Sequence, residues 1–229
     1  MNMLTFTFAG QTLQALGSGA LFWPEEGLLC VSDLHWCKSD RLARRGGDLL
    51  PPYETRDTLI RLAEAIDATG ASTVVCLGDS FDDLAGVDAL TTADRDLLAG
   101  LQAGRRWIWI EGNHDPGPMD LGGTHLASFS ARGLHFRHIA SDGTPEVSGH
   151  YHPKVKLSLK GRRIARPAFL YDAQRMILPA FGTYTGGLWA SDPALSDLFA
   201  SDARAILTGP TPHGLAYQGT GQATPARAD

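Results

Sequence analysis

The chain has 229 residues, a length that suits one large domain or two small ones. Apolar residues make up 43% and charged residues 20%, so the chain can bury a sizeable core, and wholesale disorder is excluded. The formal charge is −5, from 20 Lys and Arg against 25 Asp and Glu. This balance differs from the strongly basic one of dedicated nucleic-acid-binding domains.

The sequence carries no signal for a membrane span or for secretion. It has no run of 18 apolar residues, and its first residues lack a basic start followed by a long apolar stretch. Its cysteines, Cys30, Cys37 and Cys76, are odd in number and lack zinc-ribbon spacing, which argues against a disulfide framework. We therefore expect a protein of the reducing cytoplasm that does not interact with membranes.

The first 24 residues predict short antiparallel strands, because apolar and polar side chains alternate and glycines interrupt them. A continuous apolar run at 28–31 then predicts a buried strand. Apolar residues at i, i+3, i+4 and i+7 from Leu59 predict a helix over 55–68 that ends at Gly70.

The next segments repeat this alternation of strand and helix. Residues 72–80 predict a second buried strand, 91–104 a second amphipathic helix, and 105–115 a third strand. The order of strand, helix, strand, helix and strand predicts a parallel core sheet with right-handed crossovers.

After about residue 120 the pattern changes to short strands separated by Gly and Pro, which favours antiparallel sheet. A short helix at 194–200 and a last strand at 203–209 are expected near the end. The Gly-, Pro- and Thr-rich residues 209–229 predict a flexible tail, which leaves a single domain over 1–208.

Polar side chains follow each of the three buried strands at the point where the strand ends. Asp33 and His35 follow the first strand, Asp79 the second and Asn113 the third. Because ligands bind beyond the carboxyl ends of strands in open α/β sheets, we expect these side chains to lie close together. The segment 149–152 adds two histidines, and this mixture of donors suits a divalent ion such as manganese, iron or zinc.

The spacing within these motifs supports a shared site. Asp33 and His35 are two residues apart and point to the same side of an extended strand end, as do His150 and His152. Glycines precede Asp79, Asn113 and His150, where they allow the chain to turn sharply as it leaves a strand. A single such residue commonly marks an ordinary turn, so the weight lies on the combination.

That combination resembles the calcineurin-like metallophosphoesterases. The motifs are D-x-H at 33–35, G-D at 78–79, G-N-H-D at 112–115 and G-H-x-H at 149–152, within residues 28–153. The strings DLHWCK, GHYHP, RRIARPAFLYD and LPAFGTYTGGL are similar to the bacterial DNA-ligase-associated endonuclease branch. The resemblance implies an α/β fold, with a sandwich of mixed β-sheets flanked by helices in a single domain.

The resemblance further implies a centre for two divalent ions, with manganese the first expectation and iron or zinc as alternatives. The implied ligands of one ion are Asp33, His35 and His152. Those of the other are Asn113, His150 and a further histidine, while Asp79 bridges the two. His138 fits the further histidine best, and His125 and His135 are its competitors.

The resemblance gives His114 the role of protonating the leaving oxygen or stabilising the transition state. Asp115 would orient His114 or fix the loop, unless it is an ordinary turn residue. Lys38 and Arg137 are candidates for phosphate contacts, and Tyr151 is a candidate for stacking on bases.

Residues 151–175 hold seven basic residues and one acidic residue, a local charge of +6. Arg162 and Arg163 at its centre suggest a track for a polyanion beside the site, although a solvated strand face has the same composition. Trp36 is expected to pack against the sheet, and Trp107 and Trp109 to lie in the core.

Three functions remain open at this point. The first is a two-metal endonuclease that hydrolyses single-stranded DNA during repair, together with a DNA ligase and a helicase encoded nearby. The second is a phosphodiesterase or phosphatase for small nucleotides, which the acidic net charge favours. The third is a non-catalytic scaffold, which the complete set of motif residues disfavours.

Overall fold

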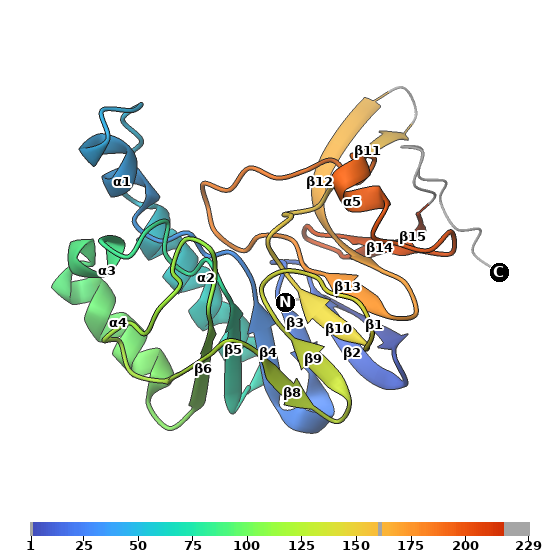
Figure 1. The fold of residues 1–229 in the computed structure, drawn as a ribbon, viewed down its shortest axis with the longest axis horizontal. Coiled ribbons are helices and arrows are strands. Elements are labelled where there is room, and N and C mark those ends of the chain that lie inside the picture. Colours follow the sequence, from blue (N-terminus) through green and yellow to red (C-terminus); the bar gives the residue numbers. More distant parts are fainter. Residues whose placement is uncertain (1, 160–161, 218–229) are drawn as a thin grey trace.

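Two β-sheets pack face to face, and most of the helices cover the outer face of the first sheet (Figure 1). The computed structural model describes residues 2–159 and 162–217, without the side chains of 158, 159, 162 and 163. No helix in the described part of the chain combines the length and the apolar character that crossing a membrane requires. The predicted single-domain α/β sandwich of mixed sheets is confirmed.

The first sheet has seven strands in the order β1-β2-β3-β4-β5-β6-β7. Their bounds are Met3–Phe8, Gln11–Leu16, Leu21–Trp23, Leu28–Val31, Thr73–Leu77, Arg106–Ile110 and Thr124–Leu126. Strands β1 to β4 pair antiparallel, whereas β4, β5, β6 and β7 run parallel. This confirms both the antiparallel start and the parallel core expected from the sequence.

The helices lie in the connections of the chain. They are α1 (Lys38–Arg44), α2 (Glu54–Thr69), α3 (Gly86–Ala89), α4 (Thr92–Gln102) and α5 (Pro193–Ser196), with a 3-10 turn at Pro24–Glu26. Helix α2 ends as predicted at Gly70, whose φ of 64° is left-handed. Helix α4 begins after Thr91, whose side chain accepts the N–H of Asp94 at 3.1 Å.

The second sheet has the order β15-β14-β12-β13-β10-β9-β8, and β11 pairs with β12 outside that path. The bounds of β8 to β15 are Phe129–Ala131, Leu134–Phe136, Glu146–Ser148, Lys154–Leu159, Arg162–Tyr171, Arg175–Ile177, Arg204–Leu207 and His213–Ala216. The antiparallel pairing expected for the second half is confirmed for most neighbours in this sheet, but it was wrong at β10, which is parallel to both β9 and β13. The β11–β12 hairpin between β10 and β13 supplies the long return that a parallel neighbour requires.

The predicted flexible tail was wrong over residues 213–216. Strand β15 pairs antiparallel with β14, and Leu215 and Tyr217 are buried against the second sheet. The free energy gained by burying these two side chains offsets the conformational entropy lost when this Gly- and Pro-rich segment becomes ordered. Residues 218–229 lie outside the described part of the chain.

Two layers of apolar side chains fix where the strand ends lie. One layer fills the space between the sheets and includes Val75, Ile108 and Phe169, and the other lies beneath the helices and includes Leu59 and Trp109. All three cysteines are buried and free, as expected. Because β4, β5 and β6 are parallel neighbours, their carboxyl ends share one edge of the sandwich, where the polar motifs begin.

Candidate metal centre

The segment that follows β4 brings the two sheets together at one carboxylate. Asp33 is fully buried, and its Oδ2 accepts the N–H of His150 at 2.9 Å and the hydroxyl of Ser32. Its Oδ1 lies 3.1 Å from Nε2 of His152. A residue at the end of the first sheet therefore contacts both histidines that follow β10 in the second sheet.

The backbone at the motif residues is left-handed rather than extended. The φ angles of Asp33, His35, Asp79, His150 and His152 are 54°, 46°, 47°, 69° and 48°. The expected extended spacing within each pair was therefore wrong, because the chain turns sharply as soon as the strand ends. Asp and His are among the non-glycine residues that tolerate this region.

The glycines before the motif residues have two different functions. Gly78 has a φ of 75° and makes the expected turn. Gly112 and Gly149 instead permit close approach: a Cβ at Gly112 would lie 2.2 Å from the backbone N of Asp79, and one at Gly149 would lie 1.7 Å from Oγ of Ser32. Any side chain at these two glycines would push the strand exits apart.

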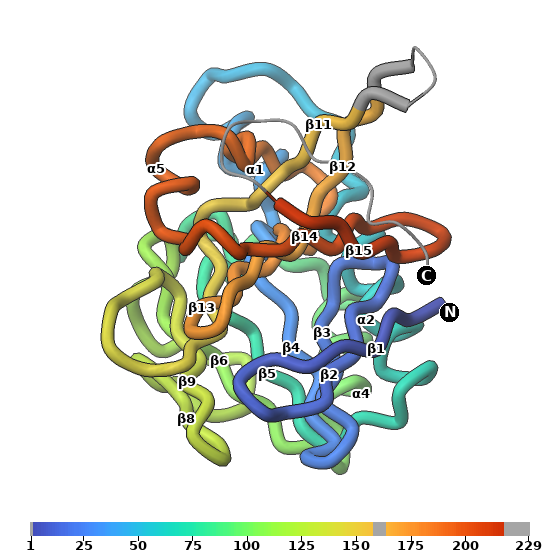
Figure 2. Tube along the Cα trace, turned by 90° about the vertical axis from the view of Figure 1, so that its right-hand side faces the viewer, coloured from blue at the N-terminus to red at the C-terminus, as the bar shows by residue number. Residues whose placement is uncertain are grey.

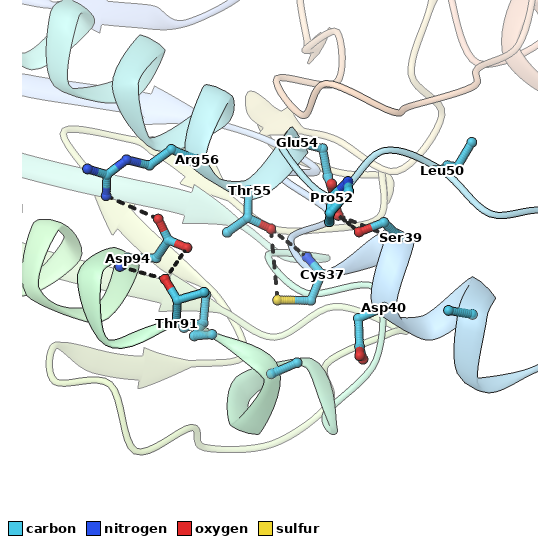
Figure 3. Close-up of a pocket in the computed structure, with 13 residues that line it drawn as sticks. Cys37, Ser39, Asp40, Leu50, Pro52, Glu54, Thr55, Arg56, Thr91 and Asp94 are labelled. Carbon is cyan, nitrogen blue, oxygen red and sulfur yellow. Dashed lines mark hydrogen bonds and ion pairs between the residues drawn. The ribbon is translucent and has the colours of Figure 1, made fainter.

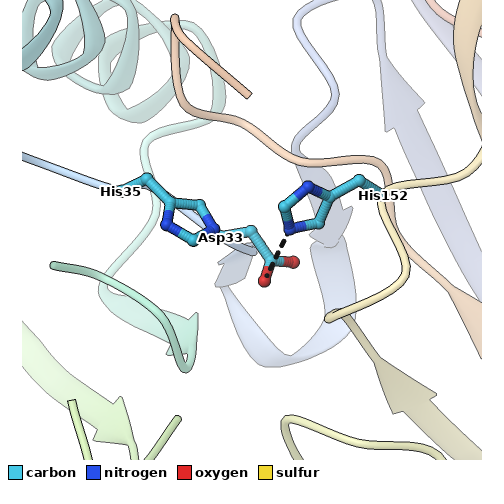
Figure 4. Close-up of side chains that lie close together, drawn as sticks. All are labelled: Asp33, His35 and His152. Carbon is cyan, nitrogen blue, oxygen red and sulfur yellow. Dashed lines mark ion pairs between the residues drawn. The ribbon is translucent and has the colours of Figure 1, made fainter. Parts of the chain in front are cut away.

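Asp33, His35 and His152 form the first cluster of possible ligands, with ligand atoms within 4.8 Å of one another (Figure 4). Oδ1 of Asp33, Nε2 of His35 and Nε2 of His152 are buried and make no hydrogen bond within the described residues. Buried polar atoms without partners are costly, and a cation placed among these three would satisfy all of them. The donor set therefore fits a divalent ion.

Asp82 orients His35, although Asp82 belongs to none of the sequence motifs. Nδ1 of His35 lies 2.8 Å from Oδ1 of Asp82, so Nδ1 donates to the carboxylate and the lone pair of Nε2 faces the cluster. Asp82 also binds Arg41 and lies 3.9 Å from Nζ of Lys38. Although burial raises the pKa of Asp82, the hydrogen bond from His35 and the charge of Lys38 hold it below its usual value.

Asp79, His138 and His150 form the second cluster. Nε2 of His138 lies 2.9 Å from Oδ1 of Asn113, 3.2 Å from Nδ1 of His150 and 3.3 Å from Oδ2 of Asp79. Nδ1 of His138 donates to the carbonyl of Leu77 at 2.8 Å, which leaves Nε2 free to face the other donors.

The structure separates His138 from its two competitors. Nε2 of His125 contacts the main chain of Met119 at 3.0 Å, and the His125 ring stacks on Trp109. His135 hydrogen-bonds to Ser130 on the neighbouring strand β8. Only His138 of the three joins a cluster of donors among the described residues.

The local electrostatics favour the ligand forms of Asp79 and His150 but not that of His138. Burial raises the pKa of Asp79, but hydrogen bonds and charge from His138 outweigh it and lower this pKa to about 2. Burial and the neighbouring charge of His138 lower the pKa of His150. Asp79 is therefore ionised and His150 neutral at pH 7, as metal binding requires. Burial lowers the pKa of His138, but the carboxylates of Asp79 and Asp33 outweigh it and hold this pKa above its usual value, so His138 has to release a proton when it binds a cation.

The sequence model of calcineurin-like phosphoesterases matches residues 28–203. The chain belongs to this family. The fold of the family uses a dinuclear metal site, and the two clusters supply histidine and carboxylate groups suited to two ions. The crystal structure of nuclease MPE from Pseudomonas putida is similar, with 27% identity, a TM-score of 0.69, and 90% of this chain and 96% of that chain covered. A search of curated proteins returned no match.

His114 of this phosphoesterase lies between the two clusters. Its N–H donates to Oδ1 of Asp79 at 2.8 Å, and its Nδ1 donates to the carbonyl of Asp82 at 2.8 Å. Its ring centroid is 5.2 Å from that of His35. Because Nδ1 is engaged by the backbone, Nε2 is the nitrogen that remains for a substrate oxygen.

Asp115 holds the loops of the phosphoesterase in place. Its carboxylate accepts the N–H groups of Asp79, Ser80, Phe81 and Gly112 at 2.7–3.1 Å. Burial, together with the charge of Asp79, raises the pKa of Asp115 to about 6. No hydrogen bond joins its carboxylate to His114 in the described part of the chain, so the geometry makes it a positioning residue for the loop rather than a partner of that histidine.

Replacement of Asp115 with Ala is expected to lower the free energy of unfolding by at least about 2 kcal/mol, because it leaves four buried N–H groups without an acceptor. Urea denaturation in the presence of a chelator measures this effect without a contribution from bound ions. Asp67→Ala removes an exposed carboxylate from α2 and is the matched control. Equal stability of the two variants would contradict the proposed role of Asp115 in holding these loops.

A segment of the phosphoesterase far along the chain also supports the centre. The N–H of Phe181 donates to the carbonyl of Ser32 at 2.8 Å, and that of Gly182 donates to the carbonyl of Asp33 at 3.1 Å. A Cβ at Gly182 would lie 2.1 Å from the carbonyl oxygen of Leu34. The string LPAFGTYTGGL contains no predicted site residue, but its backbone hydrogen bonds hold the loop that carries Asp33 in place.

The proposed substrate contacts fall in different environments. Arg137 lies 3.3 Å from the buried carboxylate of Glu146, and the ring of Tyr151 packs edge-on against His150 at 5.1 Å. Trp36, Trp107 and Trp109 are buried, as expected. The side chains of Arg162 and Arg163 lie outside the described part of the structure.

Proposed function

We propose that this phosphoesterase is a two-metal endonuclease that cleaves single-stranded DNA. The observation that carries the proposal is the pair of adjacent clusters, with Asp33 and His152 in one and Asp79 and His138 in the other. Nδ1 of His138 lies only 3.9 Å from Oδ1 of Asp33. Ions bound by the two clusters would act on one phosphodiester group, as two-metal phosphoesterase chemistry requires.

The proposed ligands of the first ion are Asp33, His35 and His152, and those of the second are Asn113, His138 and His150, with Asp79 shared. Divalent ions in such a site lower the pKa of water and stabilise charge on phosphoryl oxygens. His114 in its doubly protonated form would donate the proton on Nε2 to the leaving oxygen and become the neutral ring, while Nδ1–H stays on the carbonyl of Asp82 and the backbone N–H stays on the Asp79 carboxylate. Asp82 and the carbonyl of Leu77 keep the tautomers of His35 and His138 suited to ligation.

Two observations support DNA as the substrate over a small nucleotide. The similar solved structure is that of a nuclease. The β11–β12 hairpin also stands at the same end of the molecule as α1 and carries Lys154 and Lys156, which lie 5.0 and 3.7 Å from the ring of Trp189 (Figure 2). The proposed polyanion track at Arg162 and Arg163 begins the second strand of this hairpin, and basic residues along one element are able to neutralise several phosphates of a strand.

The proposal includes manganese as the native metal, a cytoplasmic role in DNA repair, and cooperation with a DNA ligase and a helicase encoded nearby. The donor set of histidine nitrogens with carboxylate and amide oxygens suits manganese, iron and zinc alike. Genes for a ligase and a helicase beside this one would support the repair role, and their absence would count against it.

Removal of metal with a chelator is expected to abolish hydrolysis, because every proposed step depends on the two ions. Addition of Mn²⁺ should restore it at about two ions per chain, counted by elemental analysis. Circular single-stranded DNA is the decisive substrate, since only internal cleavage makes it linear. Cleavage of cyclic dinucleotides without cleavage of the circle would favour the small-nucleotide phosphodiesterase that the net charge of −5 suggests.

A further inference from the structure

Two tyrosines from distant parts of the sequence meet on the surface of the molecule. Tyr53 directly precedes α2 and is 53% exposed. Its ring centroid lies 5.5 Å from that of Tyr184, with the planes at 60°, and the Tyr184 hydroxyl donates to the carbonyl of Pro51 at 3.1 Å. We call Tyr53 and Tyr184 the tyrosine pair.

The loop that carries Tyr184 is anchored at the candidate metal centre. Tyr184 belongs to a loop whose first residue, Gly182, donates its N–H to the carbonyl of Asp33 at 3.1 Å. Leu188 at the other end donates its N–H to the carbonyl of Tyr151 at 3.1 Å. The loop therefore begins at one proposed ligand segment and ends at another, and its trace passes the side chains of the first cluster (Figure 4).

Hydrogen bonds made by the neighbouring residues fix the backbone beside each tyrosine. The hydroxyl of Thr183, next to Tyr184, donates to Asp57 at 2.6 Å. Beside Tyr53, Glu54 accepts the hydroxyl of Ser39 at 2.7 Å, and these two residues line a cavity of about 360 Å³ beneath α1 (Figure 3). Anchoring an exposed ring (Tyr53) and a half-buried one (Tyr184) before binding reduces the entropy lost when a flat ligand stacks on them.

We propose that the tyrosine pair stacks an unpaired nucleobase of the strand whose phosphodiester lies at the metal centre. The inference rests on the proposed function and adds a surface that would recognise the bases of a single-stranded substrate. Phosphate and sugar offer no π-face, whereas every base does, so an aromatic surface beside a phosphodiester site recognises bases without reading sequence. Bases in a duplex are stacked on their neighbours, so the tyrosine pair favours single strands.

The test compares oligothymidylate with an abasic oligomer of the same length, since the two have the same backbone charge. The Mn²⁺-loaded protein should cleave the base-bearing strand at least about tenfold faster in kcat/KM, the effect expected of one stacked base. In the double variant Tyr53→Leu/Tyr184→Leu this ratio should fall close to one. Tyr53→Phe/Tyr184→Phe keeps both rings and should keep the ratio, as should the control Ile60→Ala, which alters an exposed apolar residue of α2.

Equal cleavage of the two oligomers by the unaltered protein would overturn the proposed base stacking by the tyrosine pair. An unchanged ratio in the leucine variant would overturn it as well. Equilibrium binding of both oligomers with Ca²⁺ in place of Mn²⁺, followed by fluorescence anisotropy, does not depend on hydrolysis. If no DNA is cut, the proposed endonuclease fails, yet base-dependent binding that the leucine variant loses would still support the pair. Equal affinities would overturn it. Thermal denaturation confirms that each variant is folded.

Discussion

Replacement of Asp79 with Ala is expected to lower kcat/KM for phosphodiester hydrolysis by more than about 100-fold, since even groups that only orient metal ligands contribute about 10–100-fold. Oδ2 of Asp79 lies 3.3 Å from His138, and Oδ1 accepts the N–H of His114. The substitution removes a carboxylate that belongs to the second cluster and also contacts the proposed proton donor. Elemental analysis should show fewer than two ions per chain.

Asp79→Asn separates the two functions of this carboxylate. Asparagine can still accept the N–H of His114 but carries no charge to share between two cations, so we expect metal loss and low activity with a fold closer to that of the unaltered protein. Asp202→Asn, at an exposed position, is the control. Full metal content and activity in Asp79→Asn would exclude a shared carboxylate.

Replacement of His114 with Ala is expected to lower kcat by about 10²–10⁴-fold while metal content stays near two ions per chain. The reason is geometric: Nδ1 of His114 is held by the carbonyl of Asp82, and the ring stands beside His35. Loss of this side chain removes a proton donor from the site without removing a proposed ligand.

Metal content decides between two roles for His114, because His35, Asp82 and His114 also place donor atoms within 4.8 Å of one another. Loss of an ion in His114→Ala would make His114 a ligand and overturn its role as a proton donor. His35→Ala should lose metal, and the exposed His213→Ala should change neither quantity. Unchanged turnover in His114→Ala would remove this residue from the mechanism.

The sequence predicted the core of the centre because each motif follows a buried apolar run. Parallel pairing of β4, β5 and β6 brings the ends of these strands to one edge, so local pattern and topology lead to the same residues. The residue types of the segment 149–152 also marked His150 and His152 as possible ligands, but the contact of His152 with Asp33 crosses from one sheet to the other and has no local sequence signal.

Four features depend on contacts that local sequence does not record. Asp82 meets His35 across 47 positions, and Gly182 reaches Asp33 across a still longer separation. Neither pairing leaves a periodic signal. The parallel strands β9, β10 and β13 were missed because short strands separated by turns have the same pattern in parallel and antiparallel sheets. The contact between Tyr53 and Tyr184 was also missed, because the two residues are far apart in the sequence and share no pattern.

The left-handed backbone at Asp33, His35, Asp79, His150 and His152 affects how substitutions at these positions should be designed. Alanine disfavours positive φ by about 1–2 kcal/mol, whereas asparagine adopts it readily. An alanine scan of the centre would therefore combine a conformational penalty with the loss of a donor atom. Asparagine replacements keep the local chain geometry, so they report donor chemistry with less interference from altered folding.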